Sequence, residues 1–151
     1  MRAVVLDPAD RILLVRFTNP FTGESWWATT GGGIDEGESE EGALRRELRE
    51  EAGLEPAELG PCVWTRESMY EWGPQLVRQV ERYYLVRAPS ADLSPGLSQE
   101  ELAAENVHEV RWWALSELES TEETLAPRAL PALLRSLLEE GPPPEPIDAG
   151  V

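Results

Sequence analysis

The sequence predicts a single α/β domain, in which β-strands and α-helices alternate along one chain. Its 151 residues suit one compact domain. A composition of 41% hydrophobic and 28% charged residues is typical of globular proteins. Apolar runs with strand character lie on both sides of a clearly helical segment, and a second helical pattern lies near the end of the chain. We therefore expect one domain over residues 1–140, followed by a tail over residues 141–151.

The first part of the chain is typical of three strands followed by a glycine turn. Arg2–Leu6 and Ile12–Val15 are apolar runs, and Asp7–Asp10 between them has the composition of a turn, so the pair predicts a hairpin. Trp26–Thr29 is rich in aromatic and β-branched residues and predicts a third strand. The three consecutive glycines Gly31–Gly33 are expected to end regular structure there.

A helix is predicted from Ser39 to Ala52. Ser39 is a favourable N-cap residue, and Gly53 is a natural stop after the last turn. A narrow apolar stripe recurs every four residues and would face the core; it consists of Leu44, Leu48 and Ala52.

The second half of the chain predicts further strands and one long helix. The expected elements are strands at Val63–Tyr70 and Leu76–Val86, a loop over 88–98, a helical turn at Gln99–Glu105, a strand at Val110–Trp113, a helical turn at Leu115–Leu118 and a helix at Pro127–Glu140. The tail from Gly141 is rich in proline and cannot continue that helix, so we expect a mobile, extended end.

Charge and composition exclude several classes of partner. Asp and Glu number 29 against 13 Lys and Arg, which gives a formal net charge of −16 that disfavours polymeric nucleic acid and anionic membranes. The single Cys62 and the single His108 make an internal disulfide and a Cys/His zinc site implausible. There is no apolar run of membrane-spanning length, and the apolar residues after Met1 are too few for a secretory signal. We expect a soluble cytoplasmic protein.

Three acidic residues of the predicted helix carry the main functional signal. Glu47, Glu50 and Glu51 have the spacing i, i+3 and i+4, which places their side chains within one arc of the helix surface. Carboxylates gathered in this way repel one another unless a cation lies among them, and a hard divalent cation such as Mg²⁺ or Mn²⁺ suits such an all-oxygen site. In so acidic a protein, the same residues considered alone are also compatible with an ordinary solvated helix face.

The order and spacing of residues 32–54 favour the functional interpretation. They match the pattern G-x5-E-x7-R-E-U-x-E-E-x-G-U, where U is a bulky aliphatic residue, without a mismatch. The chain therefore resembles the Nudix hydrolases, whose sequence signature is this box. One neighbouring position departs from the family pattern, because Thr30 stands where a proline often precedes the glycines. The matching positions are Gly32, Glu38, Arg46 to Leu48, Glu50, Glu51, Gly53 and Leu54.

The resemblance implies an α/β/α sandwich built on a mixed β-sheet. It also implies hydrolysis, dependent on Mg²⁺ with Mn²⁺ as a substitute, of a pyrophosphate linkage in a nucleoside diphosphate joined to another group. Nucleotides, nucleotide sugars, ADP-ribose and dinucleoside polyphosphates are substrates of this kind. A non-catalytic nucleotide-binding or regulatory module with the Nudix fold is the alternative, although such modules usually lose a glutamate of the box.

Roles carried over from the resemblance fall on the matching residues. Glu47, Glu50 and Glu51 resemble the metal-binding carboxylates, with a backbone carbonyl of Gly32 or Gly33 as a further ligand. The resemblance makes Glu50 and Glu51 catalytic as well, and the pair Arg46 and Glu38 resembles the one that holds the glutamates in position.

Residues outside the box are expected to complete the site. The family often supplies another glutamate before a late tryptophan strand; Glu100, Glu101 and Glu105 are candidates, and we favour Glu105 as ligand or base. Substrate contacts are expected from residues near predicted loop ends or beside the cavity, although most aromatic residues of such a domain lie in its core. These candidates are Trp26, Tyr70, Trp72, Arg78 and Glu81. The expected partner is a small phosphorylated metabolite, and the resemblance leaves a homodimer open.

Overall fold

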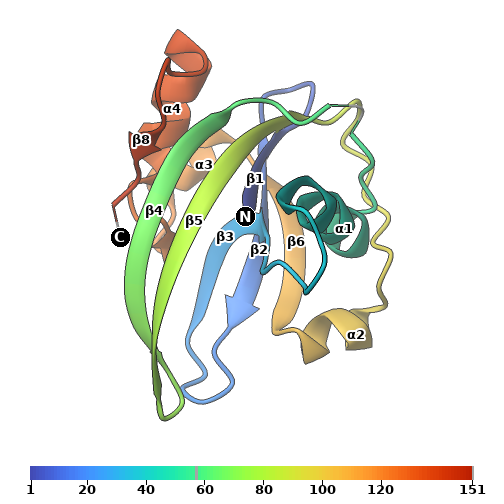
Figure 1. Ribbon diagram of the computed structural model, residues 1–151. Coiled ribbons are helices and arrows are strands. Elements are labelled where there is room, and N and C mark those ends of the chain that lie inside the picture. Colours follow the sequence, from blue (N-terminus) through green and yellow to red (C-terminus); the bar gives the residue numbers. More distant parts are fainter. Residues whose placement is uncertain (57, 151) are drawn as a thin grey trace.

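Figure 1 shows the computed structural model of the chain, which describes residues 1–56 and 58–150. The N-terminal half contains three strands, the first helix and two long strands, and the C-terminal half contains shorter elements. In chain order they are β1 (Arg2–Leu6), β2 (Ile12–Thr18), β3 (Ser25–Gly31), α1 (Glu40–Ala52), β4 (Cys62–Trp72), β5 (Gln75–Arg87), α2 (Gln99–Ala104), β6 (Val107–Trp113), α3 (Leu115–Ser120), β7 (Leu125–Ala126), α4 (Leu130–Glu140) and β8 (Ile147–Asp148).

The strands form one mixed sheet with the order β6-β2-β3-β1-β5-β4-β8, and β7 pairs with β3 beside this path. Most neighbours are antiparallel, whereas β1 runs parallel to β5, β7 to β3 and β8 to β4. The parallel pairing places Arg2 beside Tyr83, so the first residues of the chain lie next to the middle of β5.

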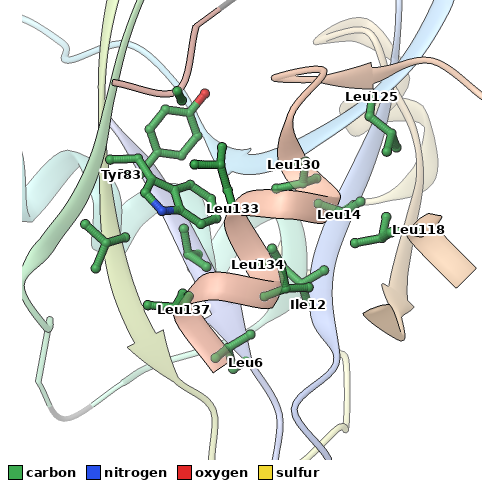
Figure 2. Packing of buried hydrophobic residues seen from close by; sticks show 14 of the residues in the cluster. Leu6, Ile12, Leu14, Tyr83, Leu118, Leu125, Leu130, Leu133, Leu134 and Leu137 are labelled. Carbon is green, nitrogen blue, oxygen red and sulfur yellow. The ribbon is translucent and has the colours of Figure 1, made fainter. Parts of the chain in front are cut away.

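Helices cover both faces of the sheet (Figure 1), which gives the expected α/β/α sandwich. On one face, Leu44 and Leu48 of α1 pack with Ala3, Val5 and Leu13 of the sheet. On the other face, four leucines of α4 pack against the strands, as Figure 2 shows; they are Leu130, Leu133, Leu134 and Leu137. We call these the α1 face and the α4 face, since the alternation of side chains assigns each strand residue to one of them.

Several elements differ from their predicted bounds. The third strand continues through Thr30 to Gly31, because β1 pairs with it there and supplies hydrogen-bond partners to the glycine. The strands β4 and β5 are joined by only two residues, Gly73 and Pro74, where the sequence suggested a longer loop. The last helix begins at Leu130 and not at Pro127.

The tail differs most from its expectation. Residues Ile147 and Asp148 form β8 along the edge strand β4, and the backbone N–H of Ala149 donates to the carbonyl of Thr65 (2.7 Å). The side chain of Ala149 is buried in the core of the α4 face. The prolines do end α4, as predicted, but the residues after them return to the sheet because the edge of β4 offers free backbone groups.

None of the described helices is both long enough and apolar enough to cross a membrane.

Candidate active site

The helix that carries the acidic residues begins and ends where the sequence predicted. The Ser39 side chain accepts a hydrogen bond from the backbone N–H of Gly42, which is the N-cap contact. At the other end Gly53 has φ = 70°, a left-handed conformation that glycine adopts without strain. Burial of Leu44 and Leu48 against the sheet fixes the rotation of α1 about its axis. The acidic positions therefore lie along the side of the helix next to the glycine turn.

Arg46 is at the centre of a network of acidic side chains. Its guanidinium donates two hydrogen bonds to the Glu38 carboxylate, at 2.9 and 3.0 Å, and others to Glu47 (3.0 Å) and Glu50 (3.4 Å). The paired hydrogen bonds lower the pKa of Glu38 to about 2, and the acidic surroundings raise the pKa of Arg46. One arginine thus connects the loop before α1 to two carboxylates of the helix, as the resemblance implied for Arg46 and Glu38.

Three carboxylates come together beside this arginine. Oxygen atoms of Glu47, Glu50 and Glu105 all lie within 4.8 Å of one another. Glu47 and Glu50 project from α1, whereas Glu105 follows α2 and comes from a segment far away in the sequence. Partial burial and the like charges of Glu47 and Glu50 raise the pKa of Glu105. The donor set is all oxygen and strongly negative, which fits a hard divalent cation. Glu100 and Glu101 do not belong to the cluster; Glu101 instead caps its own helix.

Glu51 lies behind the cluster rather than within it. Its side chain is 1% exposed, and one oxygen accepts a hydrogen bond from the backbone N–H of Gly31 (3.3 Å). Burial, together with the adjacent negative charge of Glu47, raises the pKa of Glu51. Its other oxygen has no hydrogen-bond partner among the described residues. A buried carboxylate oxygen without a partner, beside three gathered carboxylates, is a position at which a divalent cation would supply the missing partner.

The glycine turn approaches the cluster closely. A Cβ atom on Gly32 would lie 2.8 Å from an oxygen of Glu47, whereas one on Gly33 would meet nothing within 4 Å. Both carbonyls expected as metal ligands have polar neighbours: that of Gly32 accepts from the amino group of Met1 (2.9 Å), and that of Gly33 from Arg46 (3.4 Å). The absence of a side chain on Gly32 therefore gives Glu47 its position.

The predicted substrate residues divide between the two faces of the sheet. Trp26 and Arg78 belong to the α1 face, where the carboxylates lie, because they alternate with core residues of the α4 face. Trp26 stacks on Phe17, with ring centroids 6.1 Å apart, and Phe17 pairs with Val107, two residues after Glu105. Arg78 is exposed and donates a hydrogen bond to Glu67. These two residues are compatible with contact to a ligand that is held at the cluster.

The other three predicted substrate residues belong to the α4 face. The register of β4 and β5 places Tyr70, Trp72 and Glu81 there, in line with the buried Tyr83. Trp72 contacts both Tyr70 and Phe21, so these rings join the tips of two hairpins. The sequence alone did not show to which face these residues belong, and the register assigns all three to the α4 face.

Glu81 is enclosed by two arginines that sequence reasoning missed. Its side chain is 2% exposed; Arg2 donates to one oxygen (2.5 Å) and Arg66 to the other (2.8 Å). Burial acts to raise the pKa of Glu81, but the two guanidinium groups outweigh it and lower that pKa. Neither arginine belongs to a motif, and only the pairing of β1 with β5 brings Arg2 to Glu81.

Comparison with known proteins gives this geometry a context. A family model described as NUDIX domain matches residues 1–136. The RNA pyrophosphohydrolase of Shewanella oneidensis is 35% identical over 86 residues, which cover 50% of this chain and 49% of that protein. The RNA pyrophosphohydrolase of Shewanella loihica is 43% identical over 58 residues, or 38% of this chain and 33% of that protein. The chain thus spans about half the length, or less, of these curated relatives.

Solved structures share the fold at lower identity. The NUDIX domain of Shewanella oneidensis NrtR, crystallised with ADP ribose, has a TM-score of 0.65 and 24% identity, and the match covers 91% of this chain and 85% of that chain. The MutT protein from Methanosarcina mazei has a TM-score of 0.60 and 18% identity, with coverage of 92% and 91%. At these identities the similarity establishes the fold alone.

Proposed function

This chain belongs to the Nudix family, and on that premise we propose that it is a Mg²⁺-dependent pyrophosphohydrolase of nucleoside diphosphates linked to another group. One observation carries the proposal: Glu47, Glu50 and Glu105 place carboxylate oxygens within 4.8 Å of one another. Such a cluster is unfavourable for the protein alone, because the charges repel, and it becomes favourable when a divalent cation binds.

The box residues fit the cation in distinct ways. Glu47, Glu50 and Glu105 would hold it directly, and Glu51 would reach it with the oxygen that has no other partner. When bound, Mg²⁺ neutralises phosphate charge and lowers the pKa of a coordinated water. We expect no direct contact from Gly33, since its carbonyl is the acceptor for Arg46.

The protein side chains supply orientation and a proton acceptor. Arg46, held by the two hydrogen bonds that it donates to Glu38, keeps Glu47 and Glu50 directed towards Glu105. Glu105 is the exposed member of the cluster, so a water molecule beside the cation can reach its carboxylate. We therefore assign to Glu105 the acceptance of a proton from the attacking water, and to Arg46 and Glu38 the positioning of the other carboxylates.

The proposed substrate is a small, nucleotide-linked metabolite. A formal charge of −16 disfavours a long polyanion, while the charge of a diphosphate is neutralised locally by the cation. The half-buried Trp26, which stacks on Phe17, offers an aromatic ring for a base, and the exposed Arg78, paired with Glu67, offers a guanidinium. With such a substrate we place the protein in the cytoplasm.

A hydrolysis panel tests this proposal. The purified chain is incubated with Mg²⁺ or Mn²⁺ and ADP-ribose, dNTPs, nucleotide sugars, diadenosine polyphosphates or RNA with a 5′-triphosphate, and the products are separated by chromatography. We expect cleavage of at least one small nucleotide, and loss of that cleavage on chelation or in Glu50→Gln. Binding without cleavage across the panel would support the non-catalytic module instead, and cleavage of the RNA alone would contradict the proposed substrate class.

A further inference from the structure

We infer that Glu81 is a positioning residue, which fixes the place of Glu51 through Arg2 and the Gly31 peptide group. This inference rests on the proposed function, because it assigns Glu81 to the support of a carboxylate that we place at the cation site. It replaces the expectation from the sequence that Glu81 contacts the substrate. Both oxygens of Glu81 are engaged by arginines, and its side chain is buried.

The first step of the connection runs from Glu81 to Arg2. Arg2 donates to Glu81 through Nε at 2.5 Å, and Arg66 fixes the other oxygen from the neighbouring strand β4. The Arg2 side chain is only 14% exposed and that of Arg66 15%, so little water competes for these charges. The position of the Arg2 guanidinium is thus set by two strands that contribute nothing to the Nudix box.

The second step runs from Arg2 to the glycine turn. Its Nη1 donates to the carbonyls of Thr29 (3.2 Å) and Gly31 (3.1 Å) on β3. Strand β1 pairs with β3 only at Gly31 and Thr30, and β7 pairs with it at Trp27 and Ala28. The Arg2 side chain therefore supplies a donor to Thr29, which lies between these two pairings, and to Gly31 at the start of the β1 pairing.

The third step runs from Gly31 to Glu51. The backbone N–H of Gly31 donates to the Glu51 carboxylate at 3.3 Å, so the peptide groups around this glycine are held by Arg2 on one side and by Glu51 on the other. Gly31 also has φ = 133°, and a Cβ there would lie 2.2 Å from the Met1 carbonyl. Because the Gly31 backbone packs this closely against Met1 and Arg2, we expect a shift of the Arg2 guanidinium to displace the Gly31 peptide groups and the buried carboxylate with them.

Two different explanations would connect Glu81 to the cation, and they predict opposite effects on cation affinity when Arg2 is removed. If the charges acted only through space, removing the negative Glu81 would weaken cation binding and removing the positive Arg2 would strengthen it. If the connection acts by position, either removal frees Gly31 and Glu51, and both variants bind the cation more weakly. Outer partners of metal ligands typically contribute 10–100-fold to affinity. We expect a weakening of about 10-fold in each variant.

The test measures Mn²⁺ affinity by calorimetry for the full chain and for Glu81→Gln, Arg2→Gln and the double variant, with a melting curve for each. We expect both single variants to bind Mn²⁺ about 10-fold more weakly, and the double variant to lose little more than either. The kcat for the substrate found in the panel falls in parallel, while KM changes by less than about twofold. A purely structural role would lower the melting temperature and leave Mn²⁺ affinity unchanged.

The matched control is another arginine–carboxylate pair that joins β5 to the β1–β2 turn. Arg87 donates to Asp10 at 3.0 Å, but both side chains are exposed and lie at the opposite end of β1. We expect Arg87→Gln to bind Mn²⁺ like the unmodified chain.

If Glu81→Gln does not fold, Arg2→Lys provides the same test. Lysine keeps the charge, but its single ammonium lacks the forked geometry that reaches Glu81 and two carbonyls.

The outcomes separate this inference from the proposed function. If the unmodified chain binds Mn²⁺ and hydrolyses a nucleotide, while Arg2→Gln binds Mn²⁺ as tightly or more tightly, the positioning role is wrong and the proposed function stands. Additive losses in the double variant would also overturn the positioning role. If the unmodified chain binds no divalent cation, the proposed function fails, and the inference fails with it.

Discussion

Replacing Glu105 with glutamine is expected to stabilise the metal-free protein while weakening its response to Mg²⁺. Glu105 is the exposed member of the cluster, and its carboxylate has both Glu47 and Glu50 within 4.8 Å. The variant keeps the shape of the side chain and removes one negative charge. If the cluster exists to bind a cation, the protein without that cation must be destabilised by the repulsion.

The size of the effect follows from the distances. Two unit charges 4.8 Å apart in water interact with about 0.9 kcal/mol. Glu105 is repelled by Glu47 and Glu50, and less strongly by Asp35, and it is attracted by Arg46, so the net effect is equivalent to about one repulsive pair. Screening by salt lowers this repulsion energy further. We therefore expect the metal-free Glu105→Gln variant to gain about 0.5–1 kcal/mol in the free energy of unfolding. For a domain of this size that corresponds to a rise of about 1–4 °C in melting temperature.

Thermal melting with and without Mg²⁺ measures both effects. The metal-free variant should melt at a higher temperature than the unmodified chain, and the further rise on adding Mg²⁺ should be smaller than in the unmodified chain. Glu100→Gln is the matched control, since it makes the same change on the adjacent helix outside the cluster. It should bring no stabilisation and leave the Mg²⁺ effect unchanged. A metal-free Glu105→Gln that melts below the unmodified chain, or an undiminished Mg²⁺ effect, would refute the reasoning.

Four further predictions concern other parts of the site. Glu51→Gln should lower turnover by about two orders of magnitude without loss of the fold, as phosphate release and melting curves would show; unchanged turnover would remove Glu51 from the site. Mg²⁺ should raise the melting temperature of the unmodified chain, and a titration without any shift would count against a cation site. Gly32→Ala should weaken Mn²⁺ binding, because its Cβ would displace Glu47, and Gly33→Ala should weaken it less; equal losses would contradict this use of the turn. Glu38 has a folded-state pKa of about 2 against an ordinary value of 4.5, so it contributes stability that is complete above pH 4.5 and is lost as the pH falls towards 2. Glu38→Gln should therefore show a weaker decline in stability over that range, and an identical acid profile would contradict the pairing with Arg46.

The Nudix box could be predicted in detail from the sequence because its geometry is local. Spacing along one helix decides that Glu47 and Glu50 share a side, and Ser39 and Gly53 mark the ends of that helix. Glu105 was found only through the resemblance to a family, since its approach to the helix depends on how α2 follows the sheet. Glu51 follows the same helical spacing, yet it is buried behind the cluster because the sheet occupies that side of α1.

The contacts that sequence reasoning missed all depend on pairing between distant strands. The parallel register of β1 and β5 brings Arg2 to Glu81, and no local pattern specifies that register. The same uncertainty left the faces of Tyr70 and Trp72 open, since alternation separates two sets of residues without saying which set is inward. The docking of the tail on β4 depends on a sheet edge that exists only once the sheet has formed.

The central claim is that residues of the Nudix box and Glu105 together form a divalent cation site. Electron paramagnetic resonance of Mn²⁺, titrated into the unmodified chain and into the double variant Glu50→Gln/Glu105→Gln, tests it most directly. We expect saturable binding of Mn²⁺ to the unmodified chain and binding at least about 10-fold weaker in the double variant. Equal affinity of the two proteins for Mn²⁺ would contradict it.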